Sequence, residues 1–177
     1  MKNTTSNEQH VFESAGLGLA PFRYVGSFED KGPHKSVING VQVEIGAPGQ
    51  PMGTCAYCGQ GIAICCQIKS ADGKTFTVGS DCVTKTGDKG LKQLVAKDSR
   101  KRAKGREEER VAVLRDRLEN DLELRSSLES QPHPRGFQDR ETGQDLTLLD
   151  QVEWMMANSG LSGRMKMVRA IAKMEKK

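Results

Sequence analysis

Two different periodicities divide the chain. In the first half, Val41, Val43 and Ile45 alternate with polar residues and follow an Asn39-Gly40 pair, which is a strong signal for a two-residue β-hairpin turn. In the second half, apolar residues recur at intervals of three and four, the spacing of one face of an α-helix. The chain is therefore predicted to be an α+β protein, with strands first and helices afterwards.

A second hairpin is predicted in the middle of the strand-rich half. Apolar side chains alternate with small or polar ones up to Ile68, and a turn follows that ends at Gly73. A three-residue loop with Gly73 in the left-handed conformation pairs Ile68 with Phe76 and Cys66 with Val78. This register puts the apolar side chains on one face, whereas a two-residue turn would divide them between both faces. Because one face has to be buried, the first register is expected.

Helical periodicity begins after this hairpin. A short apolar stripe at Leu91, Leu94 and Val95 is followed by a charged stretch, and the stripe resumes at Val111. This pattern predicts one long, narrow-striped helix, with Gly105 as the residue where it would break. The sequence Gln131–Pro134 ends it, since proline cannot continue a helix.

The C-terminal segment is predicted to form two helices. Apolar residues from Leu146 to Met156 mark the first, Asn158-Ser-Gly160 ends it, and Ser162 is the expected N-cap of the second. The pair could read DNA as a helix-turn-helix, but core packing or partner docking explains the apolar faces equally well and is preferred.

The composition indicates the size of the core and the cellular environment of the cysteines. The 177 residues are 36% hydrophobic and 28% charged, which predicts a modest core with much solvated helix surface. No apolar run reaches the length of a membrane span, and the polar Met1–His10 segment lacks the core of a signal peptide. We therefore expect a cytoplasmic protein without membrane contact. In that reducing environment, clustered cysteines are metal ligands more often than disulfides.

All five cysteines lie between residues 55 and 82. Cys55 and Cys58 form a Cys-x2-Cys pair followed by Gly59, a spacing that turns two sulfurs toward one ion. The predicted hairpin returns the chain to the same place, so Cys82 can supply a third sulfur. Its position at the start of a helix also predicts a stabilised thiolate. No histidine lies in the cluster, so we expect a structural Zn²⁺ rather than a catalytic one.

The fourth ligand stays open at this point. Cys66 is the preferred residue because it lies on the hairpin face that the following helix covers. Cys65, Asp81, His34 and His10 are the further candidates.

The segment from Cys55-Ala-Tyr-Cys58-Gly through Val78-Gly-Ser-Asp-Cys82 resembles a small zinc module of uncharacterised phage and bacterial proteins. It also looks like a treble-clef-type finger, in which a knuckle and a hairpin precede a helix. The resemblance covers about residues 50–100 and implies a structural zinc and, often, nucleic-acid binding. The sequence departs from a regular treble clef, because no second Cys or His follows Cys82 after two residues.

A basic segment follows the cysteines. From Asp88 to Arg106 the chain carries eight Lys or Arg against two Asp, although its net charge is only +4. Such a cluster attracts phosphates, and arginine adds bidentate contacts. The competing explanation is a solvated helix face, in which the following Glu107–Glu109 pair with these cations. The candidate nucleic-acid-binding residues are Lys97, Arg100, Lys101, Arg102, Lys104 and Arg106.

These observations predict a domain organisation and a function. The expected parts are a flexible N-terminus (1–20), a β-rich zinc-binding domain (21–95), a long charged helix (96–130), a loop (131–144) and a helical hairpin (145–177). We expect a non-enzymatic, zinc-stabilised protein, with a phage as a candidate source, that contacts DNA or RNA and takes no small-molecule substrate. The alternative is an adaptor or inhibitor that binds a host protein through its helices.

Overall fold

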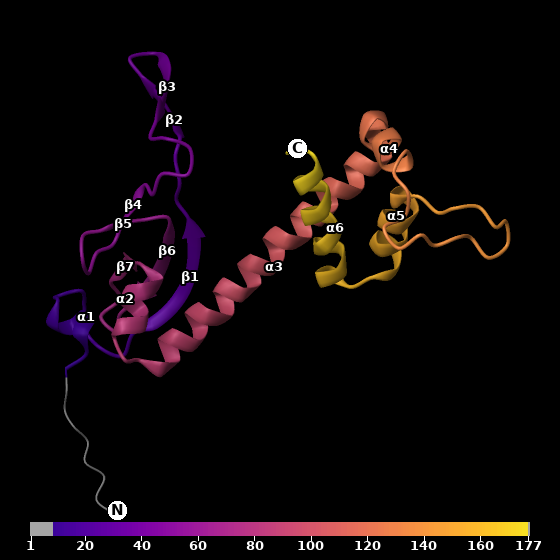
Figure 1. Ribbon diagram of the computed structural model, residues 1–177. Coiled ribbons are helices and arrows are strands. Elements are labelled where there is room, and N and C mark those ends of the chain that lie inside the picture. The colour runs from indigo at the N-terminus through magenta and orange to yellow at the C-terminus, as the bar shows by residue number, and fades with distance from the viewer. Residues whose placement is uncertain (1–8, 177) are drawn as a thin grey trace, which may run out of the picture. The chain divides into compact units, whose positions relative to one another are not determined.

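The computed structural model describes residues 9–176 and confirms the α+β prediction (Figure 1). Antiparallel strands occupy the first half of the chain, and helices occupy the second. The chain divides into two compact units, Met1–Arg100 and Lys101–Lys177, and the boundary falls inside one continuous helix.

A three-stranded antiparallel sheet forms the centre of the first unit. Its strands lie in the order β1 (Arg23–Glu29), β6 (Ile64–Lys69) and β7 (Thr75–Val78). Ile68 pairs with Phe76 and Cys66 with Val78, and Gly73 has a φ of 86°. The predicted register of this hairpin is therefore confirmed. It places the alternating apolar side chains of β6 on one face, where they can be buried.

Two helices follow the sheet and share its core. They are α2 (Ser80–Lys85) and α3 (Lys89–Asn120), and the side chain of Asp88 caps α3 by accepting a hydrogen bond of 3.0 Å from the backbone N–H of Leu91. Leu91 and Val95 are one turn apart, so both face the sheet. The buried core of this unit consists of Phe12, Phe22, Cys55, Cys66, Ile68, Val78, Cys82, Val83, Leu91 and Val95.

The N-terminal segment differs from the expected flexible stretch. Residues 1–8 lie outside the described part of the chain, but Val11–Ser14 form the short helix α1. The side chain of Phe12 is completely buried and meets the rings of Phe22 and Phe76 edge-on. The buried ring of Phe12 therefore attaches this segment to the core. The polar composition of residues 1–20 does not predict that attachment.

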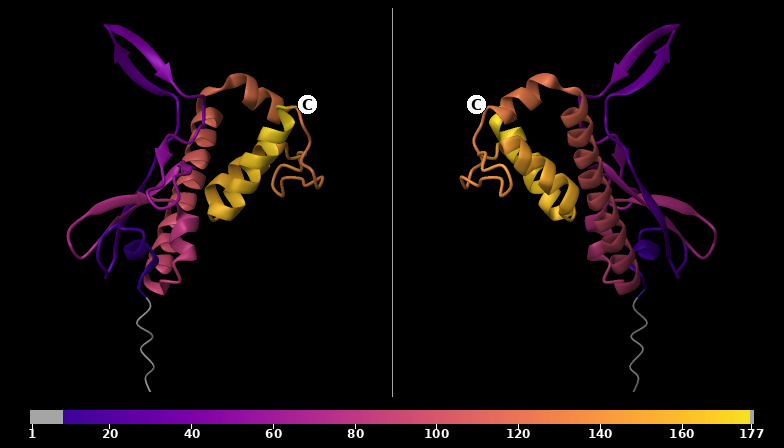
Figure 2. Two further views of the ribbon diagram at one scale, coloured as in Figure 1. Left: turned by 90° about the vertical axis from the view of Figure 1, so that its left-hand side faces the viewer. Right: turned by 90° about the vertical axis from the view of Figure 1, so that its right-hand side faces the viewer.

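A separate two-stranded ribbon extends from the sheet, as both views in Figure 2 show. It consists of β2 (His34–Ile38) and β3 (Val41–Ile45), joined by Asn39 and Gly40 with φ values of 52° and 80°. Two positive φ values in a two-residue loop define the type I′ turn that the Asn-Gly pair predicts.

The second unit is helical. After the boundary, α3 continues through Gly105 without a break and ends at Asn120, where Asp121 caps α4 (Leu122–Glu129). The prediction of a break at Gly105 is wrong, since a glycine costs a helix only about 1 kcal/mol and strong helix formers flank it. The side chain of Asp121 instead accepts the N–H of Leu124 at 2.9 Å, which starts a new helix.

The last two helices are α5 (Leu148–Asn158) and α6 (Leu161–Met174), and they pack with α4 and the end of α3. Thr147 and Asp150 form a reciprocal capping box at the start of α5. The N-cap of α6 is Gly160 rather than the predicted Ser162. The buried core consists of Val111, Leu114, Leu118, Leu124, Leu128, Leu149, Val152, Met156, Met165 and Ile171. Within residues 9–176, none of the helices combines the length and the apolarity that a bilayer crossing needs.

Candidate metal centre

The structure brings together three of the five cysteines. The Sγ atoms of Cys55, Cys58 and Cys82 all lie within 4.8 Å of one another, and those of Cys58 and Cys82 are 3.5 Å apart. None of the three forms a disulfide. A tetrahedral zinc ion with Zn–S bonds of about 2.3 Å holds its sulfurs about 3.8 Å apart. The three thiols are therefore spaced as ligands of one ion, and the group can hold a metal.

A tight backbone turn positions the first two sulfurs. The strands β4 (Gly53–Thr54) and β5 (Gly61–Ile62) pair on either side of it. The N–H of Cys55 donates to the carbonyl of Gln60 at 2.9 Å, and the N–H of Gly59 donates to the carbonyl of Cys55 at 2.8 Å. Gly59 has a φ of 73°, a conformation that residues with a Cβ adopt at a cost. The Cys-x2-Cys-Gly spacing thus produces the predicted knuckle.

The knuckle is fixed to the end of the hairpin. The N–H of Ala56 donates to the carbonyl of Thr77 in β7 at 2.8 Å. The chain leaves β7 through Gly79, and Cys82 lies in the first turn of α2. The Cβ that any other residue would place at Gly79 would lie only 3.1 Å from Cγ2 of Ile62, so a small residue suits this crossing. The hairpin in this way brings Cys82 back to Cys55 and Cys58.

The surroundings of Cys55 favour its thiolate. Burial alone would raise the pKa of this thiol, but hydrogen bonds from the backbone N–H groups of Gly79, Cys58 and Tyr57 outweigh burial and lower it. Such N–H donors stabilise a sulfur that carries negative charge, which is the form that binds a metal. The chemistry of the donor set therefore fits a thiolate-bound cation.

Cys82 differs from the sequence prediction. Its place near a helix N-terminus predicts a stabilised thiolate, whereas burial, followed by hydrogen bonding to Cys58 and Cys55, raises its pKa. The Cys82 thiol donates a hydrogen bond of 3.5 Å to Sγ of Cys58. A bound cation reverses this preference, because coordination requires the thiolate and releases the proton.

The preferred fourth ligand, Cys66, is not part of the group. Its side chain is fully buried in the core, at the point in β6 that pairs with Val78. Cys66 lies on the face of β6 that packs against the helices, and there it is buried as a small apolar residue. It pairs with Val78 in β7, before the chain reaches Cys82 in α2. Cys65 points to the opposite face, where burial, followed by the charge of Asp30, raises the pKa of its thiol.

The two histidines and the aspartate considered for the fourth position also lie elsewhere. Nε2 of His34 is 2.9 Å from Oδ1 of Asp30, and the ring of His10 lies 4.6 Å from that of Phe22. Asp81 is exposed on α2. Within the described part of the chain, the metal-ligand group contains Cys55, Cys58 and Cys82 alone.

Two features of the first unit, one at the cysteine group and one on α3, were missed by sequence reasoning. The backbone N–H groups of Tyr57 and Gly79 donate hydrogen bonds to the sulfur of Cys55. The sequence signals them only by position, since Tyr57 directly precedes Cys58 and Gly79 lies three residues before Cys82. The other feature is Asp98, which accepts hydrogen bonds from Tyr24 and Ser27 in β1. No local pattern connects residues more than 70 positions apart.

The candidate basic residues of α3 divide into two sets. Lys97, Arg100, Lys101 and Lys104 recur at helical spacing and are all exposed, so they form one stripe, which we call the basic stripe. Arg102 is half-buried and continues the row of Leu91, Val95 and Asp98, and Arg106 lies on another face. One ion pair supports the solvated-face explanation, since Nζ of Lys104 lies 3.6 Å from Oε1 of Glu108. Glu107 instead lies 3.8 Å from Arg169 of α6, outside the basic segment.

Comparison of the chain with models of protein families, with curated proteins and with solved structures finds no match. The fold and the site thus define this protein as an α+β protein with a three-cysteine group that can bind a metal.

Proposed function

We propose that this protein is a non-enzymatic nucleic-acid-binding protein whose first unit is stabilised by a structural zinc ion. One observation carries the proposal. Cys55 and Cys82 belong to the same buried core as Leu91 and Val95 of α3, and the basic stripe lies on the side of α3 away from those two residues. Metal binding would therefore hold the helix that presents the cations.

Zinc is the metal that this donor set favours. Thiolates select soft or borderline cations, and a cluster without histidine or a carboxylate argues against magnesium, calcium or manganese. Cys55, Cys58 and Cys82 would supply three ligands. Five clustered cysteines that act as metal ligands rather than disulfides would suit a reducing compartment such as the cytoplasm.

The basic stripe supports binding to phosphates. Asp98, an acidic residue inside the basic segment, accepts hydrogen bonds from Tyr24 and Ser27 in β1, so its carboxylate is engaged with the sheet. Four exposed cations over about two helical turns suit contacts to backbone phosphates rather than readout of base edges. Aromatic residues are absent from the stripe, so stacking on bases does not enter the proposal.

Metal content is the first test. Elemental analysis of the purified protein is expected to find one zinc per chain, and Cys55→Ala or Cys58→Ala should lose the zinc and unfold the first unit. Cys65→Ala is the matched control, because it removes a buried cysteine outside the group. Native protein without zinc would contradict the proposal.

Salt-dependent binding is the second test. The affinity for single- and double-stranded DNA and for RNA should fall steeply with salt, with a slope set by the number of phosphates contacted. Replacing Lys97, Arg100, Lys101 and Lys104 by Gln should reduce that slope by about 3 to 4 for duplex DNA, since each contact contributes about 0.9. The control variant removes four scattered cations, Lys35, Lys85, Lys166 and Lys173. Equal losses in both variants, or no binding at low salt, would count against the basic stripe.

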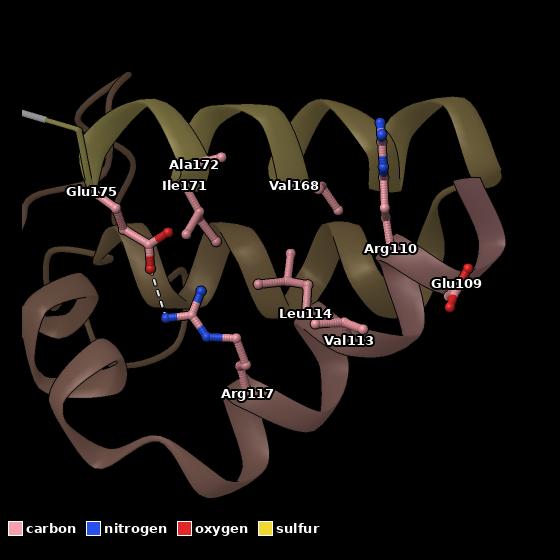
Figure 3. A pocket seen from close by; sticks show the side chains of 9 residues that line it. All are labelled: Glu109, Arg110, Val113, Leu114, Arg117, Val168, Ile171, Ala172 and Glu175. Carbon is pink, nitrogen blue, oxygen red and sulfur yellow. Dashed lines mark hydrogen bonds and ion pairs between the residues drawn. The ribbon is translucent and has the colours of Figure 1, made fainter. Parts of the chain in front are cut away.

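One observation favours a different function, that of a protein that binds a partner through its helices. A groove of about 350 Å³ lies between α3 and α6, with Val113, Leu114, Val168, Ile171 and Ala172 along it (Figure 3). An ion pair of 2.6 Å between Arg117 and Glu175 closes one end. An apolar floor with charged ends suits an amphipathic helix. Val113→Asp should abolish nuclease-resistant binding of such a partner, whereas Leu122→Asp, also exposed but outside the groove, should not.

A further inference from the structure

The three thiols of the metal-ligand group are not equivalent. Cys55 is 1% exposed and receives backbone N–H donors, and Cys82 is 8% exposed. Cys58 is exposed at the outer edge of the knuckle. An oxidant from solution therefore meets Cys58 first, because the oxidation of a sulfur depends on its exposure to solvent.

A second cysteine, Cys82, lies close to Cys58. Its Sγ lies 3.5 Å from that of Cys82. The Gly59 turn next to Cys58 leaves open space around its Cα, so the knuckle can close the remaining distance to a disulfide bond of about 2.05 Å.

We propose that Cys58 is a peroxide-oxidation site and that Cys82 is its resolving cysteine, so that oxidation converts the metal centre into a Cys58–Cys82 disulfide and releases the metal. The inference rests on the proposed zinc centre. It assigns to the centre a second property, sensitivity to hydrogen peroxide or an organic hydroperoxide, that a purely structural site does not require.

The reaction balances in two steps. The Cys58 thiolate attacks one peroxide oxygen, an S–O bond forms, the O–O bond breaks and the second oxygen leaves as water after taking up a proton. The Cys82 thiolate then attacks the sulfur of the resulting sulfenic acid, the S–S bond forms, the S–O bond breaks and hydroxide leaves to be protonated to water. Two thiolates are oxidised and one hydrogen peroxide is reduced to two waters, whereas an organic hydroperoxide would give one water and one alcohol. The disulfide would remove Cys58 and Cys82 from the set of residues that would hold zinc, and Cys55 alone would not retain the ion.

The remaining cysteines do not compete. Cys65 and Cys66 are adjacent in β6, so their side chains point to opposite faces of the sheet, and both are buried. The disulfide would still tie the knuckle to α2 in place of the metal. Reduction by a dithiol therefore regenerates the ligand set, which makes the reaction reversible.

The test uses the zinc-loaded full chain treated with one equivalent of hydrogen peroxide. Zinc release is followed with a chromogenic chelator, and the disulfide is located by differential alkylation and peptide mass spectrometry. The expected result is one zinc released per Cys58–Cys82 disulfide, with Cys65 and Cys66 still reduced, and uptake of zinc again after dithiothreitol. Cys58→His keeps a zinc ligand that cannot form a disulfide, and this variant should retain its zinc over the time in which the wild type loses it.

Three outcomes would overturn the inference while leaving the zinc centre intact. They are zinc that stays bound at full peroxide consumption, a disulfide between any other pair, and oxidation of Cys58 to the sulfinic acid without a disulfide. If Cys58→His fails to fold, the peptide map of the wild-type protein alone decides between these outcomes. Purified protein without zinc contradicts the proposed function instead, so the two failures are distinguishable.

Discussion

The phenol of Tyr24 in β1 donates a hydrogen bond of 2.8 Å to Oδ2 of Asp98 in α3, 74 residues further along the chain. The hydroxyl of Ser27 donates to the same oxygen. These contacts attach the charged part of α3 to the sheet at a point beyond Val95, the last residue of its buried apolar row. They also direct the carboxylate of Asp98 toward β1.

Removing the Tyr24 hydroxyl should loosen this attachment. Tyr24→Phe loses one hydrogen bond to a half-buried carboxylate and is expected to lower the free energy of unfolding by about 1 kcal/mol. Tyr57→Phe is the matched control, since Tyr57 is 39% exposed and its ring packs edge-on against Phe12. Urea unfolding followed by circular dichroism gives both values. Equal stability of the two variants would contradict a structural role for the Tyr24–Asp98 contact.

The same variant predicts a pH dependence. Burial, together with the hydrogen bond to Asp98 and the nearby charges, outweighs the hydrogen bond with Ser27 and raises the pKa of Tyr24 to about 12. The folded state thus holds this proton more tightly than the unfolded chain, whose tyrosines ionise near pH 10. The corresponding stabilisation is complete below about pH 10 and is lost as the pH rises toward 12. The difference in stability between wild type and Tyr24→Phe should shrink over this range, measured by urea unfolding at each pH.

Gly59 tests the geometry of the knuckle. A Cβ at this position meets no atom within 4 Å, but the φ of 73° is costly for alanine. Gly59→Ala should therefore weaken metal binding through backbone strain alone, by about 1 kcal/mol or about five-fold in affinity. Gly59→Asn should cost less, because asparagine tolerates this conformation. Competition with a zinc chelator measures both, and a larger loss for Asn than for Ala would contradict this explanation.

Leu128 and Leu122 form a matched pair in α4. Leu128 is completely buried in the core of the second unit, whereas Leu122 is 78% exposed. Leu128→Ala should cost about 2 to 5 kcal/mol through lost burial and a cavity. Leu122→Ala should stay within about 0.5 kcal/mol of wild type. The fluorescence of Trp154, the single tryptophan, follows unfolding of this unit. Similar costs for the two variants would show that α4 packs differently.

The start of α5 depends on its capping box. The Thr147 hydroxyl accepts a hydrogen bond of 3.3 Å from the N–H of Asp150, and the Asp150 carboxylate accepts one of 2.7 Å from the N–H of Thr147. Thr147→Ala should destabilise the second unit by about 1 kcal/mol. Ser162→Ala is the control, since Ser162 lies inside α6 and Gly160 is its N-cap. If Ser162→Ala lowered the free energy of unfolding by a similar amount, Ser162 would act as a helix cap after all.

Local sequence signals predicted most of the strand-rich half. Asn39-Gly40 determined one hairpin, and the demand for a single apolar face determined the register of the other, because a shift of one residue would have exposed Cys66 and Ile68. These signals act over a few residues, so they can be read without the fold. The break at Gly105 was wrong for the opposite reason. Helix continuity there depends on the whole segment, and one glycine is a small cost.

The sequence by itself also predicted which three cysteines form the group that can hold a metal. The Cys-x2-Cys-Gly turn and the hairpin return to Cys82 follow from spacing alone. Tertiary structure decided the rest. It buried Cys66 under the helices instead of placing it in the metal-ligand group, anchored α1 through Phe12, and turned Asp98 toward Tyr24. Each of these outcomes depends on contacts between side chains that are far apart in the sequence. The local pattern of apolar and polar residues does not show which of them will meet in the folded chain.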